Sequence, residues 1–155
     1  MSKEEDIMKH IESLNSSDFE VRKNAIWVLG ESGKMAKKAV PALVKLLNDK
    51  RDELCYLATF ALEKIGKDSK DVFPELIGAL NDENIRISNG TMRILRKIGR
   101  DPKIAKDMAI VLIQALNNQR SDDNWNYSYI TILERLRVKD PQLRNTINNL
   151  LIKFD

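Results

Sequence analysis

Apolar and polar residues alternate along this chain with the period of an α-helix. Leu54, Ala58, Leu62 and Ile65 follow one another at intervals of four, four and three residues, and this spacing places them on one helix face. A second apolar face follows Gly66, with a proline in its opening turns, where a missing N–H costs least. The pattern therefore predicts an all-α chain built from pairs of short helices.

The helix pairs repeat along the chain. The dipeptide Leu-Asn recurs at Leu14, Leu47, Leu80 and Leu116, at intervals of 33, 33 and 36 residues. Counted from these leucines, the first three units share residue types at positions seven, eleven, fifteen and nineteen: Val21, Leu54 and Ile87; Ala25, Ala58 and Thr91; Leu29, Leu62 and Leu95; Gly33, Gly66 and Gly99. We expect the first three sets to face the core, and each glycine to end a helix in the left-handed conformation.

A fixed period of this length is typical of a solenoid of stacked helix pairs. We predict one domain over residues 1–155 with nine helices: a capping helix at about 1–14, units at 14–46, 47–79 and 80–115, and a degenerate cap at 116–155. The last unit lacks the glycine, as suits a terminal repeat. It keeps four residues at the core spacing: Trp125, Tyr129, Leu133 and Leu136.

The first unit, FEVRKNAIWVLGESG followed by AVPALVKLLND, resembles the short HEAT-like repeats, whose pattern runs Val-Arg, Ala, Leu-Gly, Gly and Val-Pro-x-Leu. Unit two has Cys55 at the arginine position, and unit three has Ser88 there and no proline. The resemblance is good from about residue 14 to 116. It implies a right-handed α-α solenoid, an armadillo-like scaffold, and says little about function. Tetratricopeptide and ankyrin signatures are not present.

Trp27 raises the question of which way its ring points. On a wheel of 100° per residue, its position lies roughly 150° from the centre of the core face, so the ring should point outward. Equivalent or neighbouring outward positions and a basic strip in unit three give a candidate partner-binding patch: Trp27, Tyr56, Leu57, Phe60, Arg93 and Lys97. Aromatic and arginine side chains are enriched at protein interfaces. The alternative is that the ring of Trp27 folds down against a neighbouring helix.

The second helices offer another surface. Their outward residues include Lys38, Lys45, Asp71 and Glu75, which would line the concave groove of a HEAT-like stack. Such a groove suits an extended peptide or a helix. The sequence alone leaves open which of the two surfaces binds.

The composition of the chain limits which partners, metal sites and catalytic groups are expected. Apolar residues make up 43% and charged residues 32%, and the net charge is +3, so nucleic acid ranks below protein as a partner. One histidine, His10, and one cysteine, Cys55, provide no metal set, and we expect both to be half-buried fillers. No motif for a cofactor, a metal or catalysis appears. The charged start and the lack of a long apolar run predict a cytoplasmic protein without a membrane span.

These observations favour a non-catalytic protein–protein interaction module, or adaptor, and the same patch is equally suited to self-association. Two alternatives come from the resemblance. Certain alkylpurine DNA glycosylases have a HEAT-like stack with a cationic concave face, which here is mixed in charge. Phycobilin lyases carry similar short repeats, but no residues for a chromophore pocket are evident.

Overall fold

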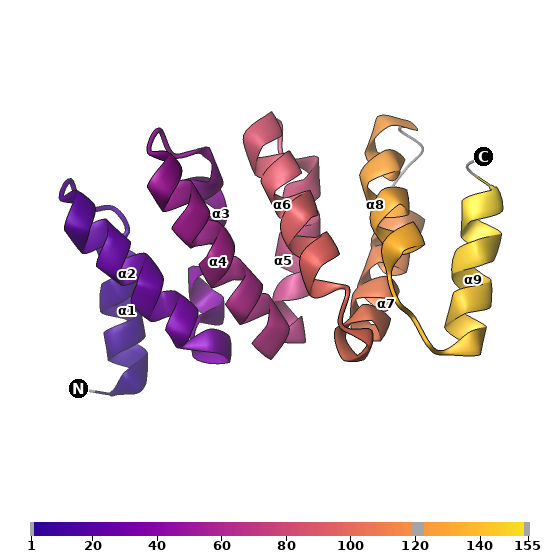
Figure 1. The fold of residues 1–155 in the computed structure, drawn as a ribbon, viewed down its shortest axis with the longest axis horizontal. Coiled ribbons are helices and arrows are strands. Elements are labelled where there is room, and N and C mark those ends of the chain that lie inside the picture. The colour runs from indigo at the N-terminus through magenta and orange to yellow at the C-terminus, as the bar shows by residue number, and fades with distance from the viewer. Residues whose placement is uncertain (1, 119–122, 154–155) are drawn as a thin grey trace.

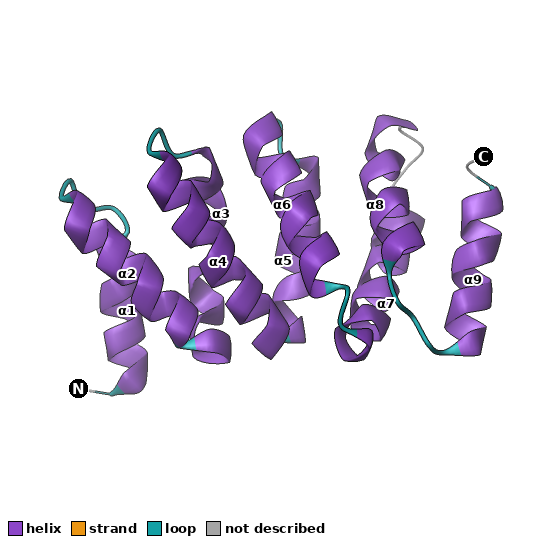
Figure 2. Ribbon diagram, in the orientation of Figure 1, coloured by secondary structure: helices purple, strands orange, loops and turns teal. Residues whose placement is uncertain are grey.

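The computed structural model of the chain describes residues 2–118 and 123–153, and the side chains of residues 123–126 also lie outside the description. Nine α-helices lie within these ranges, joined in places by 3₁₀ segments (Figure 2): α1 (Lys3–Ser13), α2 (Phe19–Glu31), α3 (Val40–Lys45), α4 (Asp52–Asp68), α5 (Phe73–Gly78), α6 (Ile85–Ile98), α7 (Pro102–Asn118), α8 (Asp123–Arg135) and α9 (Pro141–Ile152). The 3₁₀ segments are η1 (Gly33–Ala39), η2 (Leu46–Asn48), η3 (Lys70–Val72) and η4 (Ala79–Asn81).

The helices are laid out in chain order, with the two termini at opposite ends (Figure 1). The first helices of successive units, α2, α4, α6 and α8, contact one another in one layer. A second layer behind them contains α3, α5 and α7, which are also in mutual contact. This arrangement confirms the predicted all-α solenoid.

Local chemistry sets the helix starts. Asp18, Asn84 and Asp140 each accept hydrogen bonds from backbone N–H groups of the helix they precede, which satisfies donors that have no partner inside the helix. Pro41 and Pro74 lie in the first turns of α3 and α5, where proline costs no hydrogen bond. These second helices are short because 3₁₀ segments flank them on both sides, a break that the apolar period does not reveal.

The core follows the predicted repeat positions with one exception. Ala25, Leu29 and their counterparts in the next two units are fully buried, as are Tyr129, Leu133 and Leu136 in α8. Val21 is instead 43% exposed, so its assignment to the core was wrong. The helix α2 is the first of its layer, and no earlier first helix covers this side of it. The side chain of Trp125 lies outside the described residues.

The three repeat glycines do not share one role. Gly33 has the expected left-handed conformation, with φ of +52°. Gly66 lies inside α4, and Gly99 ends α6 in a right-handed conformation, so the prediction of left-handed helix stops at these two positions was wrong. A Cβ on Gly66 would come within 2.6 Å of Ile98 Cδ1. A Cβ on Gly99 would come within 2.4 Å of Leu136 Cδ2. Both glycines therefore permit close packing between units.

Candidate functional site

The outward ring of Trp27 packs against Phe60 of the next unit. The two rings are stacked, with centroids 5.9 Å apart and planes 11° from parallel, a favourable aromatic geometry. The side chain of Trp27 is still 51% exposed. Both alternatives for this residue are therefore partly right: the ring points outward from its own unit, and a neighbouring helix covers one of its faces.

We call the contact between α2 and α4 the closed seam. Beside the ring stack, Gly30 lets the two helices approach so closely that a Cβ there would lie 3.1 Å from the Cα and Cβ of Ala61. Lys64 forms an ion pair with Glu31 and also lies over the Phe60 ring, 4.9 Å from its centroid. The hollow left on the outer side of this seam has a volume of only about 230 Å³.

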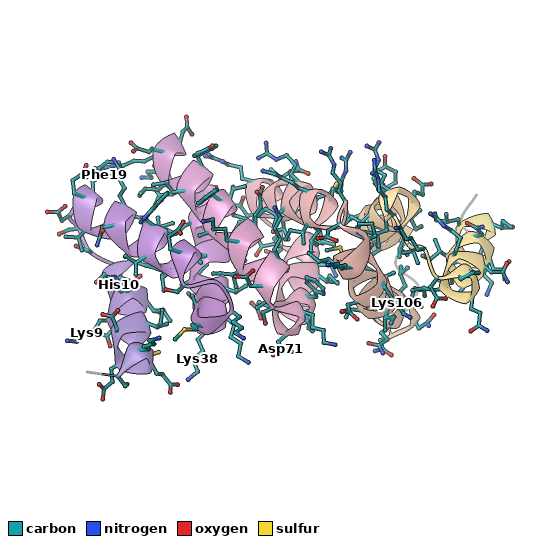
Figure 3. The ribbon with its side chains drawn as sticks, turned by 60° about the horizontal axis from the view of Figure 1, so that its bottom comes forward. Lys9, His10, Phe19, Lys38, Asp71 and Lys106 are labelled. Carbon is teal, nitrogen blue, oxygen red and sulfur yellow. The ribbon has the colours of Figure 1, made fainter. Side chains whose placement is uncertain are left out.

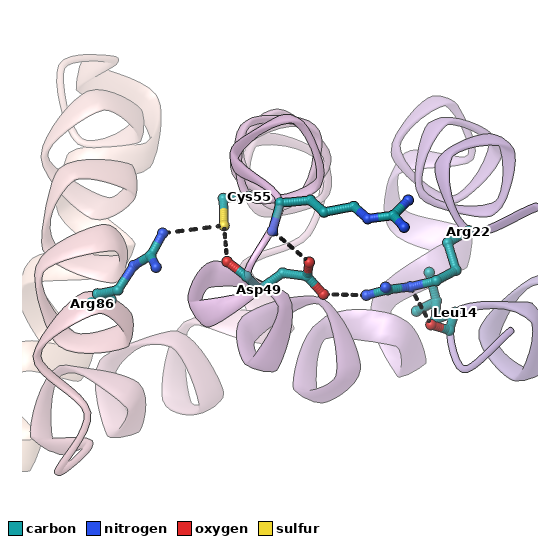
Figure 4. Close-up of polar contacts among 6 residues, drawn as sticks. Leu14, Arg22, Asp49, Cys55 and Arg86 are labelled. Atoms are coloured by element: carbon teal, nitrogen blue, oxygen red, sulfur yellow. Dashed lines mark hydrogen bonds and ion pairs between the residues drawn. The ribbon is translucent and has the colours of Figure 1, made fainter. Parts of the chain in front are cut away.

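A partly buried polar contact joins the same pair of units at their loop end (Figure 4). The guanidinium of Arg22 donates to the carbonyl of Leu14 at 3.2 Å and pairs with the carboxylate of Asp49. Burial alone would raise the pKa of Asp49, but hydrogen bonds from the Arg51 N–H and the Arg22 guanidinium outweigh it, so the pKa lies below its ordinary value. The folded state therefore stabilises the ionised form of the Asp49 carboxylate.

We call the contact between α4 and α6 the open seam. It holds a hollow of about 870 Å³ on the first-helix face, a volume in the range of ligand pockets. Its floor contains Leu47, Cys55 and Met92, and its rims carry Tyr56, which is 74% exposed, and Ile85, which is 71% exposed. Two large apolar side chains are thus exposed to solvent at the edges of a hollow whose lining is partly apolar.

Three repeat positions explain why this seam stays open. Ten residues after the unit leucine, unit two has Leu57, which is partly buried, whereas unit three has Gly90. Thirteen residues on, an aromatic residue is replaced by Arg93, so no ring stack forms on Phe60. Eight residues on, Cys55 replaces the arginine. Its thiol donates to the carbonyl of Asp49 at 3.2 Å and contacts Arg86 at 3.7 Å (Figure 4).

The α6 rim of the open seam is cationic. Arg86 pairs with the exposed Asp52 at 3.5 Å. Lys97 pairs at 2.6 Å with Glu63, whose residue is only 7% exposed. Arg93 has no carboxylate partner within the described residues. The rim therefore keeps positive charge that the described carboxylates do not neutralise.

Several charged residues of the second-helix layer form ion pairs with residues of neighbouring units. Lys38 pairs with Glu4 at 2.5 Å, and this contact lowers the pKa of Glu4. Asp71 pairs with Lys37 at 3.1 Å, and Lys106 with Asp140 at 3.0 Å. Figure 3 shows Lys38, Asp71 and Lys106 along one edge of the stack. Lys45 and Glu75 are exposed and have no ion pair within residues 2–118 and 123–153.

The predicted patch is divided between the two seams. Trp27 and Leu57 line the small hollow of the closed seam, with Phe60 stacked beside them. Tyr56, Arg93 and Lys97 line the open seam. The open seam is also lined by Ile85, Gly90 and the buried Glu63. The sequence analysis did not identify these three residues. A glycine in the middle of a helix, at a position where the preceding unit has leucine, was the available signal.

The single histidine and the single cysteine of the chain are both partly buried. His10 is partly buried and lies 3.8 Å from Asp6 (Figure 3), and Cys55 is partly buried and unpaired with any other cysteine. Within the described parts of the chain, no cluster of three or more His, Cys, Asp or Glu residues could hold a metal ion. Of the described helices, none has the length and apolar character needed to cross a bilayer.

Comparison with known proteins places part of this architecture in a family. Residues 7–63 match the family model described as HEAT repeats, and no curated protein matches the sequence. Among solved structures, an engineered protein is 21% identical, with 93% of this chain and 67% of that one covered and a TM-score of 0.46. A designed armadillo repeat protein is 14% identical, with 92% and 69% covered and a TM-score of 0.48.

A second designed armadillo repeat protein, solved in complex with the peptide (KR)4, is also 14% identical, with 97% and 77% covered and a TM-score of 0.49. The family match runs from α1 to the body of α4 and thus spans the closed seam. Residues 7–63 are therefore similar to HEAT repeats, and the described chain as a whole is an all-α stack of helix pairs.

Proposed function

We propose that this chain is a non-catalytic protein-interaction module, acting as one domain over residues 1–155, that binds a protein or peptide partner in the cytoplasm. Repeat scaffolds of this kind typically serve as protein-interaction surfaces and are generally non-catalytic. The observation that carries the proposal is the first-helix face, where Trp27 and Tyr56 on neighbouring helices stay largely exposed and Tyr56 lines the same hollow as Arg93 and Lys97.

Energetics favour this face over the second-helix layer. Large aromatic side chains and arginines contribute most of the affinity at protein interfaces. On the second-helix layer, Lys38 and Asp71 already pair with residues of neighbouring units, and a partner would have to break or share those contacts. Lys45 and Glu75 remain the candidates for a contact on that layer.

Affinity capture with matched variants tests the proposal. The bait is the full chain, compared with Tyr56→Ser/Arg93→Ser on the first-helix face and with Lys45→Ser/Glu75→Ser on the second-helix layer. All four side chains are exposed, so the fold should be retained, which circular dichroism checks. We expect a protein that wild type and the Lys45/Glu75 variant retain and the Tyr56/Arg93 variant loses.

Other results would redirect the proposal. Loss on the Lys45/Glu75 variant alone would move the contact to the second-helix layer. Capture of nucleic acid, with an affinity that falls steeply with salt, would replace protein as the partner. A concentration-dependent solution mass that the Tyr56/Arg93 variant abolishes would make the surface one for self-association.

A further inference from the structure

The apolar residue at the start of α6 is exposed, whereas the residue at the same repeat position of α2 is partly buried. Ile85 lies five residues after its unit leucine, where unit one has Phe19. Phe19 packs against the core, and the Arg51 guanidinium lies over its ring, 4.6 Å from the centroid. Ile85 and Tyr56, on the two rims of the open seam, are each more than two-thirds exposed. Exposed apolar groups of this size beside a hollow mark an interaction surface.

Gly90 gives the hollow its depth. It lies in the interior of α6, where glycine costs roughly 0.5–1 kcal/mol relative to alanine. A Cβ there would meet the Leu47 side chain, with Cδ1 at 3.3 Å, so the end of that leucine would have to shift slightly. At Gly30 the same Cβ would meet the Cα and Cβ of Ala61 at 3.1 Å, which cannot move without the helix. Gly90 and Leu47 both line the hollow, and a side chain longer than a methyl group at this position would extend into it.

The charged residues around the hollow favour a negatively charged ligand. Asp52 and Glu63 are matched by Arg86 and Lys97, and Arg93 remains without a carboxylate. Arg96 and Arg100 extend the same helix, also without a carboxylate partner among the described residues. A guanidinium binds a carboxylate through two parallel hydrogen bonds.

We propose that the open seam binds an acidic segment of another protein, with one large apolar side chain placed over Gly90 between Tyr56 and Ile85. Carboxylates flanking that side chain meet Arg93 and the neighbouring cations of α6. This inference rests on the proposed function and names its site and its class of partner.

Peptide display on the full chain tests this directly. Random peptides of about twelve residues, long enough to fill a groove, are selected on wild type, and the affinities of the enriched peptides are measured for four variants. Gly90→Leu installs the residue that unit two has at this position, and Asn24→Leu makes the same change at the equivalent position of unit one. Arg93→Glu reverses the rim charge, and Lys45→Glu is its control on the second-helix layer.

We expect enriched peptides to combine an aromatic or large aliphatic residue with several Asp or Glu residues. Gly90→Leu should weaken their binding by about tenfold or more, as expected for a filled anchor pocket, while keeping the thermal midpoint of wild type. Arg93→Glu should also weaken binding and reduce its dependence on salt. Asn24→Leu and Lys45→Glu should bind as wild type does.

Three results would overturn the inference: no enriched peptide, enrichment of lysine- and arginine-rich peptides, or acidic peptides that bind Gly90→Leu as well as wild type. Self-association of wild type that Gly90→Leu abolishes would assign the seam to a second copy instead. If affinity capture finds a protein that Gly90→Leu still retains, the proposed function stands and only the open seam fails. If neither capture nor display finds a protein ligand, both fail.

Discussion

The closed and open seams join equivalent helices of consecutive units, yet one is filled and the other is hollow. Across the closed seam, Trp27 stacks on Phe60 and Gly30 contacts Ala61. Across the open seam, a hollow of about 870 Å³ lies between Tyr56 and Ile85. Apart from Val21, the buried residues of α2, α4 and α6 share the same repeat positions. A few outward residues therefore decide whether a seam packs or remains open, while the core is nearly the same.

The match to the HEAT-repeat family model covers the closed seam but not all of the open seam. It ends at residue 63 and so includes the closed seam, with its Arg22–Asp49 contact, but leaves out α6. In the open seam the arginine position holds Cys55, and Asp82, which stands where the preceding unit has Asp49, is exposed. A solenoid tolerates such a change because each unit contacts only its neighbours. One seam can thus depart from the pattern for binding while the next keeps the stack together.

The largest effect should come from placing the same side chain in both seams. Gly30→Leu should lower the free energy of unfolding by about 2–3 kcal/mol, because the new side chain must push α4 away. Gly90→Leu should change it by less than about 1 kcal/mol, since the loss from shifting the end of the Leu47 side chain is offset by the better helix propensity of leucine. Urea unfolding of both variants measures the difference. Equal destabilisation would show that the open seam has no free space.

A smaller difference is expected at the two loop aspartates. Asp49→Asn should cost about 1–2 kcal/mol because it removes a charge-assisted hydrogen bond that is partly buried. Asp82→Asn should change stability by less than about 0.5 kcal/mol, as is usual at an exposed site. Thermal unfolding at neutral pH compares them. Similar losses would contradict the view that this contact distinguishes the closed seam.

Acid should reveal the same contact. The pKa of Asp49 is lowered in the folded state, so its stabilising contribution is present above about pH 4 and is lost as the pH falls through the lower, folded value. Wild type should therefore lose more stability than Asp49→Asn between neutral pH and about pH 3. Parallel pH profiles for the two proteins would rule out this contribution.

Thr91 offers a gain in stability. Its side chain is fully buried in α6, where the two preceding units have alanine, and its hydroxyl has no hydrogen-bond partner within the described residues. Thr91→Val keeps the shape and removes the polar group, which should raise the free energy of unfolding by about 1 kcal/mol. Thr91→Ser, which keeps the hydroxyl and loses the methyl group, should lower it. A loss in Thr91→Val would mean that the hydroxyl is satisfied.

The smallest effect is the coupling between the stacked rings. A double-mutant cycle of Trp27→Ala and Phe60→Ala should give a coupling energy of about 0.5–1 kcal/mol. The same cycle for Phe60 and Arg93, across the open seam, should give a value near zero. Equal couplings would show that the two seams do not differ in side-chain packing at this position.

Much of the fold could be predicted from the sequence because core positions repeat within single helices. The wheel placed Leu54, Ala58 and Leu62 in the core and Trp27 outside it. It could not predict that Gly66 and Gly99 serve close contacts, because those contacts depend on distances between units. The open seam was missed for the same reason: Gly90 and Glu63 gain their meaning only from what faces them on the neighbouring helix.

The most direct measurement is chemical-shift mapping of the full chain, labelled with ¹⁵N, during titration with an acidic peptide selected on it. The account predicts that the largest shifts fall on both sides of the open seam, at the amides of Tyr56, Gly90 and Arg93, while Trp27 and Lys45 change little. Shifts centred on the closed seam, or on Lys38, Lys45 and Asp71 of the second-helix layer, would contradict it.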